Sequence, residues 1–240
     1  MPKYNTRLIK RDEIASGTMA FHLEKPADFE FKAGQFMEVT IPNPPETDAE
    51  GNTRAFSIIA SPDEDYIGFA TRMRDTAFKR VMKTTAINLE LQVEAPFGDF
   101  IMHNDVSKPA VFLSGGIGIT PFFSIIKDAA KRQLLHRIFL FYSNRRPEDA
   151  AFLTELQALQ QQNQNYKFIG TMTEMEKSGT PWTGETGYIN KEMLQKYISD
   201  LAAPIYYSAG PPAMVAAMRK MLNDSGINDD NIKVEEFSGY

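Results

Sequence analysis

Residues 1 to about 104 carry hydrophobic positions that alternate with polar or small ones. Met19, Phe21 and Leu23 occupy every second position, which is the period of a half-buried β-strand. Pattern and composition predict further strands over residues 35–41, 54–60, 66–73 and 88–94, and one short helix at about 77–83. Short strands at this spacing, separated by turns rich in proline, serine and aspartate, are typical of a small antiparallel β-barrel.

The pattern changes after residue 103, where apolar runs that predict buried strands alternate with segments of helical length. This alternation predicts a parallel five-stranded, Rossmann-like α/β sheet with helices on both faces. The polar segment 104–108 is the predicted boundary between a β-barrel domain, residues 1–104, and an α/β domain, residues 105–240. The predicted strands are 109–113, 137–143, 166–171, 204–208 and 232–237, with helices that begin at residues 121 and 147 and others over 190–198 and 213–223.

A glycine-rich turn follows the first strand of the α/β half. Gly115, Gly116 and Gly118 come directly after the apolar run, and Thr120 and Pro121 open the predicted helix. Because glycine lacks a Cβ, backbone N–H groups in such a turn can approach a bulky anion at a helix N-terminus. Thr120 is predicted to cap the helix through its hydroxyl. The turn is predicted to hold a phosphate, and a tight strand-to-helix turn without a ligand is the alternative.

Composition narrows the possible chemistry. The 240 residues include no cysteine, which excludes disulfides, thiolate nucleophiles and cysteine-ligated iron–sulfur clusters within this chain. His22, His103 and His136 are widely spaced, so no metal site is predicted. The net charge of −5 argues against general nucleic-acid binding, and no apolar run is long enough to span a membrane. The first residues lack the apolar core of a secretion signal. We expect a cytoplasmic protein, not inserted in a membrane, whose redox chemistry depends on an organic cofactor.

Four motifs, in order along the chain, resemble those of the ferredoxin–NADP reductase superfamily of flavoprotein reductases. The first is Arg54-Ala55-Phe56-Ser57, which is similar to the family's flavin signature Arg-x-Tyr/Phe-Ser. The resemblance implies that Arg54 binds the flavin diphosphate, for which a guanidinium fork is well suited. It also implies that Phe56 lies beside the ribityl chain and ring, and that Ser57 lies near flavin N5. An exposed strand carrying an arginine and a serine is the alternative.

The second motif covers residues 71–79, where the family has a Gly-x-x-Ser helix start that holds the flavin pyrophosphate. This chain has Thr76 and Lys79 in place of the glycine and the serine. Thr76 or Asp75 is predicted to cap the helix, while backbone N–H groups and the Lys79 charge face the phosphates. A basic surface helix is the alternative. FAD is the implied flavin, with FMN less favoured. The implied flavin contacts in this segment are Thr71, Arg72, Thr76, Ala77, Phe78 and Lys79.

The third and fourth motifs resemble the family's pyridine-nucleotide site. Residues 115–121 match Gly-Gly-x-Gly-x-Thr-Pro, which holds the nucleotide pyrophosphate, and residues 208–212 resemble Cys-Gly-Pro-Pro, which lies beside the nicotinamide. Ala209 replaces the cysteine, so a polarisable contact to the nicotinamide is lost. The implied NAD(P) contacts are Gly115, Gly116, Ile117, Gly118, Thr120, Pro121, Ala209, Gly210, Pro211 and Pro212.

Nucleotide preference is predicted to depend on the segment after the second α/β strand, where the adenosine ribose should lie. Ser143, Asn144, Arg145 and Arg146 stand there. Two arginines and a serine could hold a 2′-phosphate, which favours NADPH over NADH.

The end of the chain also resembles the family. Val234-Glu235-Glu236-Phe237 is similar to a terminal Val-Glu-x-Tyr whose aromatic ring covers the flavin, but here the chain continues to Tyr240. Phe237 or Tyr240 is therefore expected to cover the flavin, with Glu235 as a proton relay. An edge strand followed by a tail is the alternative. The residues implied in catalysis are Ser57, Glu235 and Phe237.

The resemblance implies hydride transfer between NAD(P)H and bound FAD, and transfer of single electrons to or from a separate carrier such as ferredoxin or flavodoxin. The reacting atoms must come within roughly 3–3.5 Å of each other, so residues that position the two rings should matter more than a general base. Two alternatives stay open. One is the reductase component of a multi-component oxygenase or haem system, and the other is a low-turnover flavin-binding sensor or interaction module.

Overall fold

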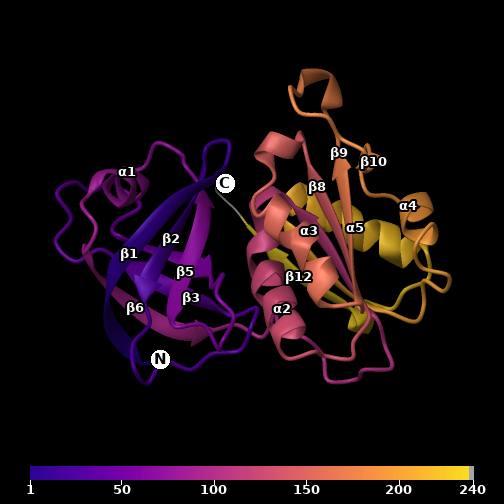
Figure 1. Ribbon diagram of the computed structural model, residues 1–240, viewed down its shortest axis with the longest axis horizontal. Coiled ribbons are helices and arrows are strands. Elements are labelled where there is room, and N and C mark those ends of the chain that lie inside the picture. The colour runs from indigo at the N-terminus through magenta and orange to yellow at the C-terminus, as the bar shows by residue number, and fades with distance from the viewer. Residues whose placement is uncertain (238–240) are drawn as a thin grey trace.

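A computed structural model describes residues 1–237, which form an antiparallel sheet followed by a parallel one (Figure 1). Six antiparallel strands pair in the order β4-β3-β6-β1-β2-β5, and the short helix α1 (Ala77–Thr84) lies after β5. Tyr240, one of the two aromatic residues expected to cover the flavin, lies outside the described residues. The strands are β1 (Lys3–Ala15), β2 (Thr18–Glu24), β3 (Phe36–Thr40), β4 (Thr53–Ser57), β5 (Tyr66–Arg72) and β6 (Glu90–Phe97).

The two edge strands of this sheet approach each other and close it into a barrel. The rings of Phe56 on β4 and Phe69 on β5 stack with centroids 4.1 Å apart. Just beyond β4, the Ile59 N–H donates to the carbonyl of Gly68 on β5 at 2.9 Å. Helix α1 adds Phe78 to the same core, where it lies near Phe56. The predicted barrel is therefore present.

Strand β1, the longest in the barrel, was not among the predicted strands. Its sequence is largely polar, and only Thr6 and Leu8 are fully buried along its thirteen residues. A strand with one buried aliphatic side chain gives almost no alternating hydrophobic signal. It is held instead by backbone pairing to β2 and β6 on its two sides.

The second sheet has six parallel strands rather than the predicted five, in the order β10-β9-β8-β7-β11-β12. The additional strand, β10, has only two residues and lies at the edge beside β9, so it has no hydrophobic pattern that could predict it. The strands are β7 (Ala110–Gly115), β8 (Ile138–Asn144), β9 (Tyr166–Met172), β10 (Glu185–Thr186), β11 (Ile205–Gly210) and β12 (Ile232–Glu236). The first sheet ends at Phe97 and the second begins at Ala110.

Helices cover both faces of the parallel sheet, as predicted. Alternate residues of β7 point to opposite faces: Phe112 packs with α2 and α3, while Val111 and Leu113 pack with α4 and α5. None of the helices within residues 1–237 is long and apolar enough to cross a membrane. The helices are α2 (Ile119–Lys131), α3 (Leu153–Gln162), α4 (Lys191–Gln195) and α5 (Pro212–Asp224), with 3₁₀ turns η1 (Gly116–Gly118), η2 (Pro147–Asp149), η3 (Met175–Lys177) and η4 (Asp229–Asn231).

Two helix starts differ from the prediction. The helix expected from Pro121 begins at Ile119, so Pro121 is its third residue, where a missing N–H still costs no helical hydrogen bond. The helix expected from Pro147 is a 3₁₀ turn, and α3 starts only at Leu153, after Phe152 adopts a left-handed backbone with φ of 58°. Proline favours the first turn of a helix but does not determine whether that helix continues.

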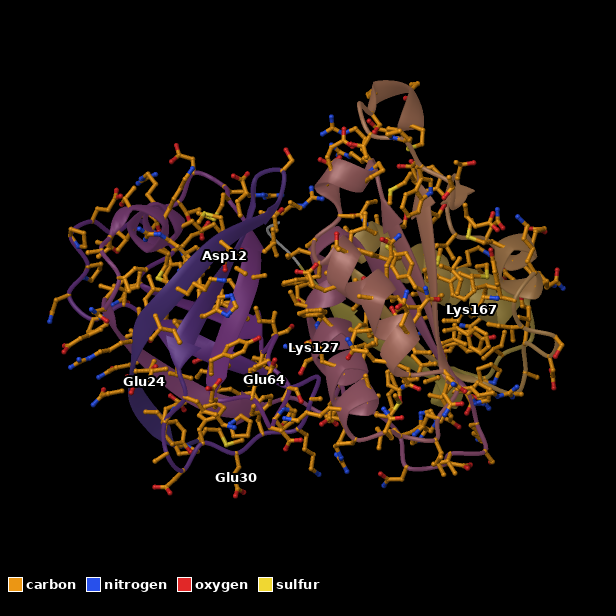
Figure 2. All side chains as sticks on the ribbon, in the orientation of Figure 1. Asp12, Glu24, Glu30, Glu64, Lys127 and Lys167 are labelled. Carbon is orange, nitrogen blue, oxygen red and sulfur yellow. The ribbon has the colours of Figure 1, made fainter. Side chains whose placement is uncertain are left out.

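Helix α2 attaches the parallel sheet to the barrel. The Ser124 hydroxyl on α2 donates to the carbonyl of Ala60 at 2.5 Å. Lys127, one turn further on, binds the Glu64 carboxylate (Figure 2). Its Nζ also lies 3.0 Å from the Tyr66 hydroxyl. Lys127 is mostly buried, and desolvation lowers its pKa against the opposing effect of Glu64. A half-buried charge pair of this kind favours one orientation of the two sheets, because separating it would leave a poorly solvated charge without its partner.

Candidate functional site: two adjoining cavities at the end of the barrel and the parallel sheet

The glycine turn leads from β7 through η1 into α2. Gly116 has φ of +54°, a backbone conformation that residues with a Cβ adopt only with strain. A Cβ on Gly118 would lie 2.3 Å from the Ala209 carbonyl oxygen on β11, so Gly118 is required by packing against the neighbouring strand. The predicted capping role of Thr120 is wrong: the N-cap of α2 is Gly118, and the buried Thr120 hydroxyl donates to the Ile117 carbonyl at 3.1 Å.

Arg72, at the end of barrel strand β5, reaches across to this turn. Its Nη2 lies 3.3 Å from the position that a Cβ on Gly116 would take. The turn and Arg72 line one wall of a cavity of about 780 Å³. Most of the residues that line this cavity belong to the second half of the chain. A guanidinium beside a helix N-terminus is a strong site for a phosphate. Arg72, for which the sequence predicts a flavin contact, lies on the wall with Gly115 and Gly116. The other lining residues are Ile117, Ser143, Asn144, Arg145, Thr173, Glu174, Tyr188, Ile189, Pro211, Ala213, Met214, Ala217, Met218 and Phe237.

The two arginines after β8 are not equivalent. Arg146 makes two hydrogen bonds of 2.8 Å to the Asp149 carboxylate and lies 3.6 Å from Glu148, so its charge is already balanced. The Arg146 guanidinium holds the pKa of the Asp149 carboxyl below its usual range. Arg145 lines the cavity and lies 3.7 Å from the Glu174 carboxylate. One arginine of the predicted pair is therefore oriented toward the cavity, and a carboxylate accompanies it.

Glu174 is a cavity residue that the sequence interpretation missed. Backbone hydrogen bonds from Thr173 to Asn144 and from Glu174 to Arg145, of 3.0 and 2.9 Å, fasten the segment after β9 to the end of β8. Lys177 donates to the Glu174 carboxylate at 2.8 Å and is the main reason that its pKa is lowered. The Glu174 carboxylate lies in the site because the segment after β9 is hydrogen-bonded to the end of β8. No local sequence motif predicts this position.

The residues of the Ser208–Pro212 segment lie in three different environments: the buried end of β11, the cavity wall and the start of α5. Ser208 and Ala209 are fully buried at the end of β11, with Ala209 against the glycine turn, and Pro211 lines the cavity. Helix α5 then starts at Pro212, and Met214 in its first turn lies against Gly115. The Gly210 carbonyl accepts a 3.0 Å hydrogen bond from the Phe237 N–H, which ties the C-terminal strand to this turn.

A second cavity, of about 320 Å³, lies at the end of the barrel. Ser57 is 4% exposed there, and its hydroxyl makes no hydrogen bond within residues 1–237. Phe56 also lines the cavity, but it is 4% exposed and its ring stacks on Phe69, so it offers little free aromatic surface. The complete lining is Phe36, Arg54, Ala55, Phe56, Ser57, Glu235, Glu236 and Phe237.

Phe237 lines both cavities, and Glu235 stands beside it in the smaller one. Burial, reinforced by the negative charge of Asp99, raises the pKa of the Glu235 carboxyl to about 7. Its Oε2 is buried without a hydrogen-bond partner among the described residues. A carboxyl with this pKa can hold or release a proton near neutral pH, which is the property a proton relay requires.

The segment around α1 confirms the predicted cap, since the Thr76 hydroxyl accepts from the Lys79 N–H at 3.4 Å. The other predicted flavin contacts in this segment are largely enclosed: Thr71, Phe78 and Lys79 are each at most 6% exposed. The Ala77 N–H, expected to face a phosphate, donates to the Asp48 carboxylate at 2.7 Å. Burial lowers the pKa of Lys79 to about 8.

The residues of the two cavities suit two different nucleotides. An unpaired buried hydroxyl on Ser57, beside Arg54, suits the polar edge of a flavin. A positive-φ glycine beneath the Arg72 guanidinium suits the pyrophosphate of a pyridine nucleotide.

Comparison with known proteins agrees with this geometry. Residues 112–220 match the oxidoreductase NAD-binding domain. The ferredoxin–NADP⁺ reductase of Neisseria gonorrhoeae, with bound FAD and NADP, matches over 98% of this chain and 98% of its own, with a TM-score of 0.79 and 21% identity. A cytochrome P450 reductase of Amycolatopsis matches over 98% of this chain and 70% of its own, with a TM-score of 0.82 and 21% identity.

The chain has the fold of the ferredoxin–NADP reductases. Within its second half, residues 112–220 are similar to an NAD-binding oxidoreductase domain. These matches confirm the resemblance, the fold class and the assignment as an NAD(P)H-linked oxidoreductase, and the predicted cofactors, FAD with a pyridine nucleotide, agree with them.

Curated relatives share part of the chain. One component of the Na⁺-translocating NADH–quinone reductase of Yersinia pestis (strain Pestoides F) is 35% identical over 153 residues, which are 61% of this chain and 37% of that component. The corresponding component in Methylococcus capsulatus is 34% identical over 168 residues, or 66% of this chain and 40% of its own. The chain thus spans well under half the length of these relatives.

Proposed function

We propose that this protein is a flavoprotein reductase that oxidises NADH in preference to NADPH and passes the electrons to a separate carrier. The observation that carries the proposal is that Phe237 lines both cavities, which brings a flavin site and a nicotinamide site to one aromatic ring. When bound, a flavin accepts hydride from a nicotinamide and releases the electrons singly. The protein's own residues bind and orient the flavin and the nicotinamide nucleotide, and they exclude water from the site.

Each residue has a distinct task in this proposal. Arg72 and the Gly116 turn bind the dinucleotide pyrophosphate, and the exposed Tyr188 ring offers a stacking surface for its adenine. The Ser57 hydroxyl donates to the flavin edge, and Phe237 covers the flavin until the nicotinamide enters. Glu235 holds the proton that reduction requires, at a carboxyl oxygen next to the same cavity.

The preference for NADH rests on Glu174. A 2′-phosphate in this cavity would meet the Glu174 carboxylate, whereas a free 2′-hydroxyl can donate to it. Arg145 is already near Glu174, and Arg146 is held by Asp149. The relatives that are components of an NADH–quinone reductase support the same preference. The arginine pair led to the expectation of NADPH, and this proposal replaces it.

The electron acceptor is proposed to be a separate protein or domain. This chain contains no cysteine, so it holds no iron–sulfur cluster on cysteine ligands of its own. Ferredoxin or flavodoxin, or the partner protein of a multi-component system, would then receive the electrons. A Na⁺-translocating complex is one such system, because the relatives named above are components of one. A cytoplasmic location stays a prediction.

An absorbance spectrum and anaerobic titration test the proposed function. We expect a yellow protein, or one that becomes yellow with added FAD, whose flavin absorbance is bleached by stoichiometric NADH and more slowly by NADPH. A preparation that takes up flavin but is not bleached by either nucleotide would favour the sensor alternative. A chain that takes up no flavin at all would refute the reductase.

Replacing Glu174 with glutamine is expected to raise kcat/KM for NADPH roughly fivefold, because it removes a negative charge and leaves Arg145 available to a 2′-phosphate. The ratio of kcat/KM for the two nucleotides, measured with a dye as acceptor, checks this. Glu176→Gln in η3 makes the same change of charge on the same segment and serves as the control. An unchanged ratio in Glu174→Gln would place the ribose elsewhere.

A further inference from the structure

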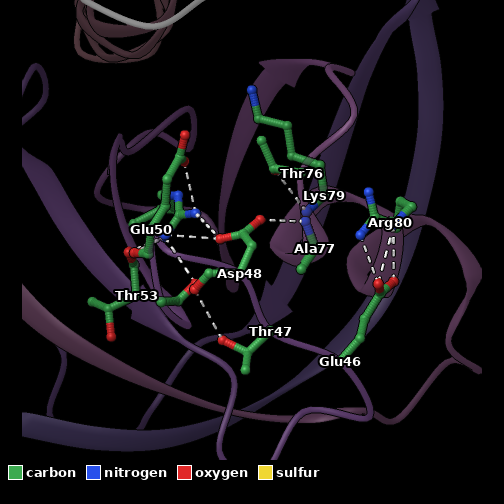
Figure 3. A network of polar contacts seen from close by, with 11 residues as sticks. Glu46, Thr47, Asp48, Glu50, Thr53, Thr76, Ala77, Lys79 and Arg80 are labelled. Carbon is green, nitrogen blue, oxygen red and sulfur yellow. Dashed lines mark hydrogen bonds and ion pairs between the residues drawn. The ribbon is translucent and has the colours of Figure 1, made fainter.

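The loop between β3 and β4 brings carboxylates to the groups that a flavin phosphate would use (Figure 3). Asp48 accepts a 2.7 Å hydrogen bond from the Ala77 N–H at the start of α1. Its other carboxylate oxygen accepts from the Glu50 N–H and lies 3.6 Å from Arg54 Nη2. The Ala77 N–H is the main reason that the pKa of the Asp48 carboxyl is lowered. A carboxylate thus occupies the position at a helix N-terminus that favours an anion.

The same loop surrounds the guanidinium of Arg54. Glu50 binds Arg54 Nη2 through its carboxylate at 2.8 Å. Arg54 Nη1 donates to the backbone carbonyls of Glu50, Gly51 and Thr53, at 2.8, 3.1 and 2.8 Å. The side chain of Arg54 is only 17% exposed. Its donors on both terminal nitrogens are therefore engaged by residues 50–53 and by Asp48.

An independent feature marks the adjoining cavity as a ligand site. Ser57, on the same strand as Arg54, is 4% exposed and lines the cavity of about 320 Å³ with it. Its hydroxyl makes no hydrogen bond within the described part of the chain. A buried hydroxyl without a partner is costly unless a ligand supplies one. At Ser57, where the flavin ring would lie, a hydrogen-bonding group is available to a ligand. At Arg54 and the Ala77 N–H, where the phosphate would lie, the chain's own carboxylates occupy the donors.

We propose that residues 46–50 form a carboxylate latch, in which Asp48 and Glu50 compete with the flavin phosphate for the Ala77 N–H and for Arg54. This inference rests on the proposed function, since it takes the smaller cavity as the flavin site. FMN and FAD must displace the latch, and riboflavin, which carries no phosphate, does not. The latch therefore reduces the difference in affinity between the phosphate-bearing flavins and riboflavin. It also lets the bound flavin dissociate and be replaced more readily.

The test compares Asp48→Asn, Glu50→Gln and the double variant with the wild-type chain. Asparagine keeps an oxygen that can accept from the Ala77 N–H, so the variant removes the charge and leaves this hydrogen bond in place. Dissociation constants for FAD, FMN and riboflavin are measured by quenching of flavin fluorescence. We expect binding of FAD and FMN to tighten roughly three- to tenfold, with riboflavin unchanged.

Asp75→Asn is the matched control, because Asp75 adjoins the Thr76 cap but its exposed carboxylate pairs with Arg80 and not with Arg54 or the Ala77 N–H. It should change FAD binding by much less than Asp48→Asn. Circular dichroism and thermal melts establish that each variant is folded.

The outcomes separate the latch from the proposed function. FAD binding that is unchanged or weaker in folded Asp48→Asn and Glu50→Gln, or riboflavin binding that tightens equally, would overturn the latch. A wild-type chain that binds only riboflavin, with FAD binding restored in the double variant, would support it. The reductase itself is judged separately, by whether NADH bleaches whichever flavin is bound. A chain that binds no flavin in any variant would overturn both.

Discussion

Replacing Gly118 with alanine is expected to destabilise the whole protein, whereas replacing Gly116 with alanine should mainly weaken nucleotide binding. A Cβ on Gly118 would lie 2.3 Å from the Ala209 carbonyl oxygen and 2.6 Å from the Gly210 Cα, both backbone atoms of a buried central region. Backbone in a paired strand cannot move aside cheaply, so we expect a loss of about 3 kcal/mol or more in the free energy of unfolding. For a chain of this size that lowers Tm by roughly 6–12 °C.

Gly116 differs because its nearest neighbour is the flexible end of Arg72, at 3.3 Å. Alanine there carries the strain of a positive φ, about 1–2 kcal/mol, and displaces the guanidinium that we propose to bind the pyrophosphate. The KM for NADH should rise while flavin stays bound. Gly17→Ala is the control, since Gly17 has φ of +60° with no atom within 4 Å of its added carbon. Thermal melts and steady-state kinetics separate the two effects.

A Gly118→Ala protein with wild-type Tm would mean that β11 can shift away from the turn. Equal KM values for NADH in Gly116→Ala and Gly17→Ala would argue that the turn does not hold the nucleotide. The two glycines stand two residues apart in one motif, and they differ both in backbone conformation, with φ of +54° at Gly116 and −60° at Gly118, and in the distance to a neighbouring strand. For this reason the sequence predicted a phosphate turn but assigned the same purpose to both.

Patterns within one element predicted the fold well. Alternating and continuous hydrophobic runs located most strands of both sheets, because burial on one or two faces leaves a periodic trace in the sequence. β1 and β10 were missed because pairing with neighbours, and not burial, holds them in place. Glu174 and Asp48 were missed for a related reason. Each lies in a loop, and each enters its site through a hydrogen bond to a residue distant in sequence.

The site assignments followed the segment of sequence in which each residue lies, and the structure shows where those segments end. Arg72 was assigned to the flavin as part of the motif at residues 71–79, and the structure places the end of β5 beside the glycine turn of the other sheet. Arg145 and Arg146 were treated as a pair, yet only Arg145 lines the cavity. Side chains of adjacent residues at a strand end point in different directions, so neighbours in sequence can serve different sites.

Replacing Glu235 with glutamine is expected to remove a loss of stability that the wild-type protein suffers as pH rises. The pKa of Glu235 is raised to about 7 by burial and by Asp99, from an ordinary value of 4.5. Below about pH 4.5 the carboxyl is protonated in both the folded and the unfolded chain. Between about pH 4.5 and 7 the unfolded chain ionises first, so stability falls with rising pH, and above about 7 the loss is complete. The shift corresponds to about 3 kcal/mol.

The measurement is the difference in Tm, or in the free energy of unfolding, between Glu235→Gln and wild type at several pH values from 4.5 to 8. Taking this difference cancels the titration of every other group that the substitution leaves unaffected. The difference should grow in favour of glutamine up to about pH 7 and then level off. Glu236→Gln, a change of equal charge at the exposed neighbour, is the control. Parallel curves for Glu235→Gln and wild type would mean that the carboxyl ionises as easily in the folded protein as in the unfolded chain, and a proton relay at Glu235 would then lose its basis.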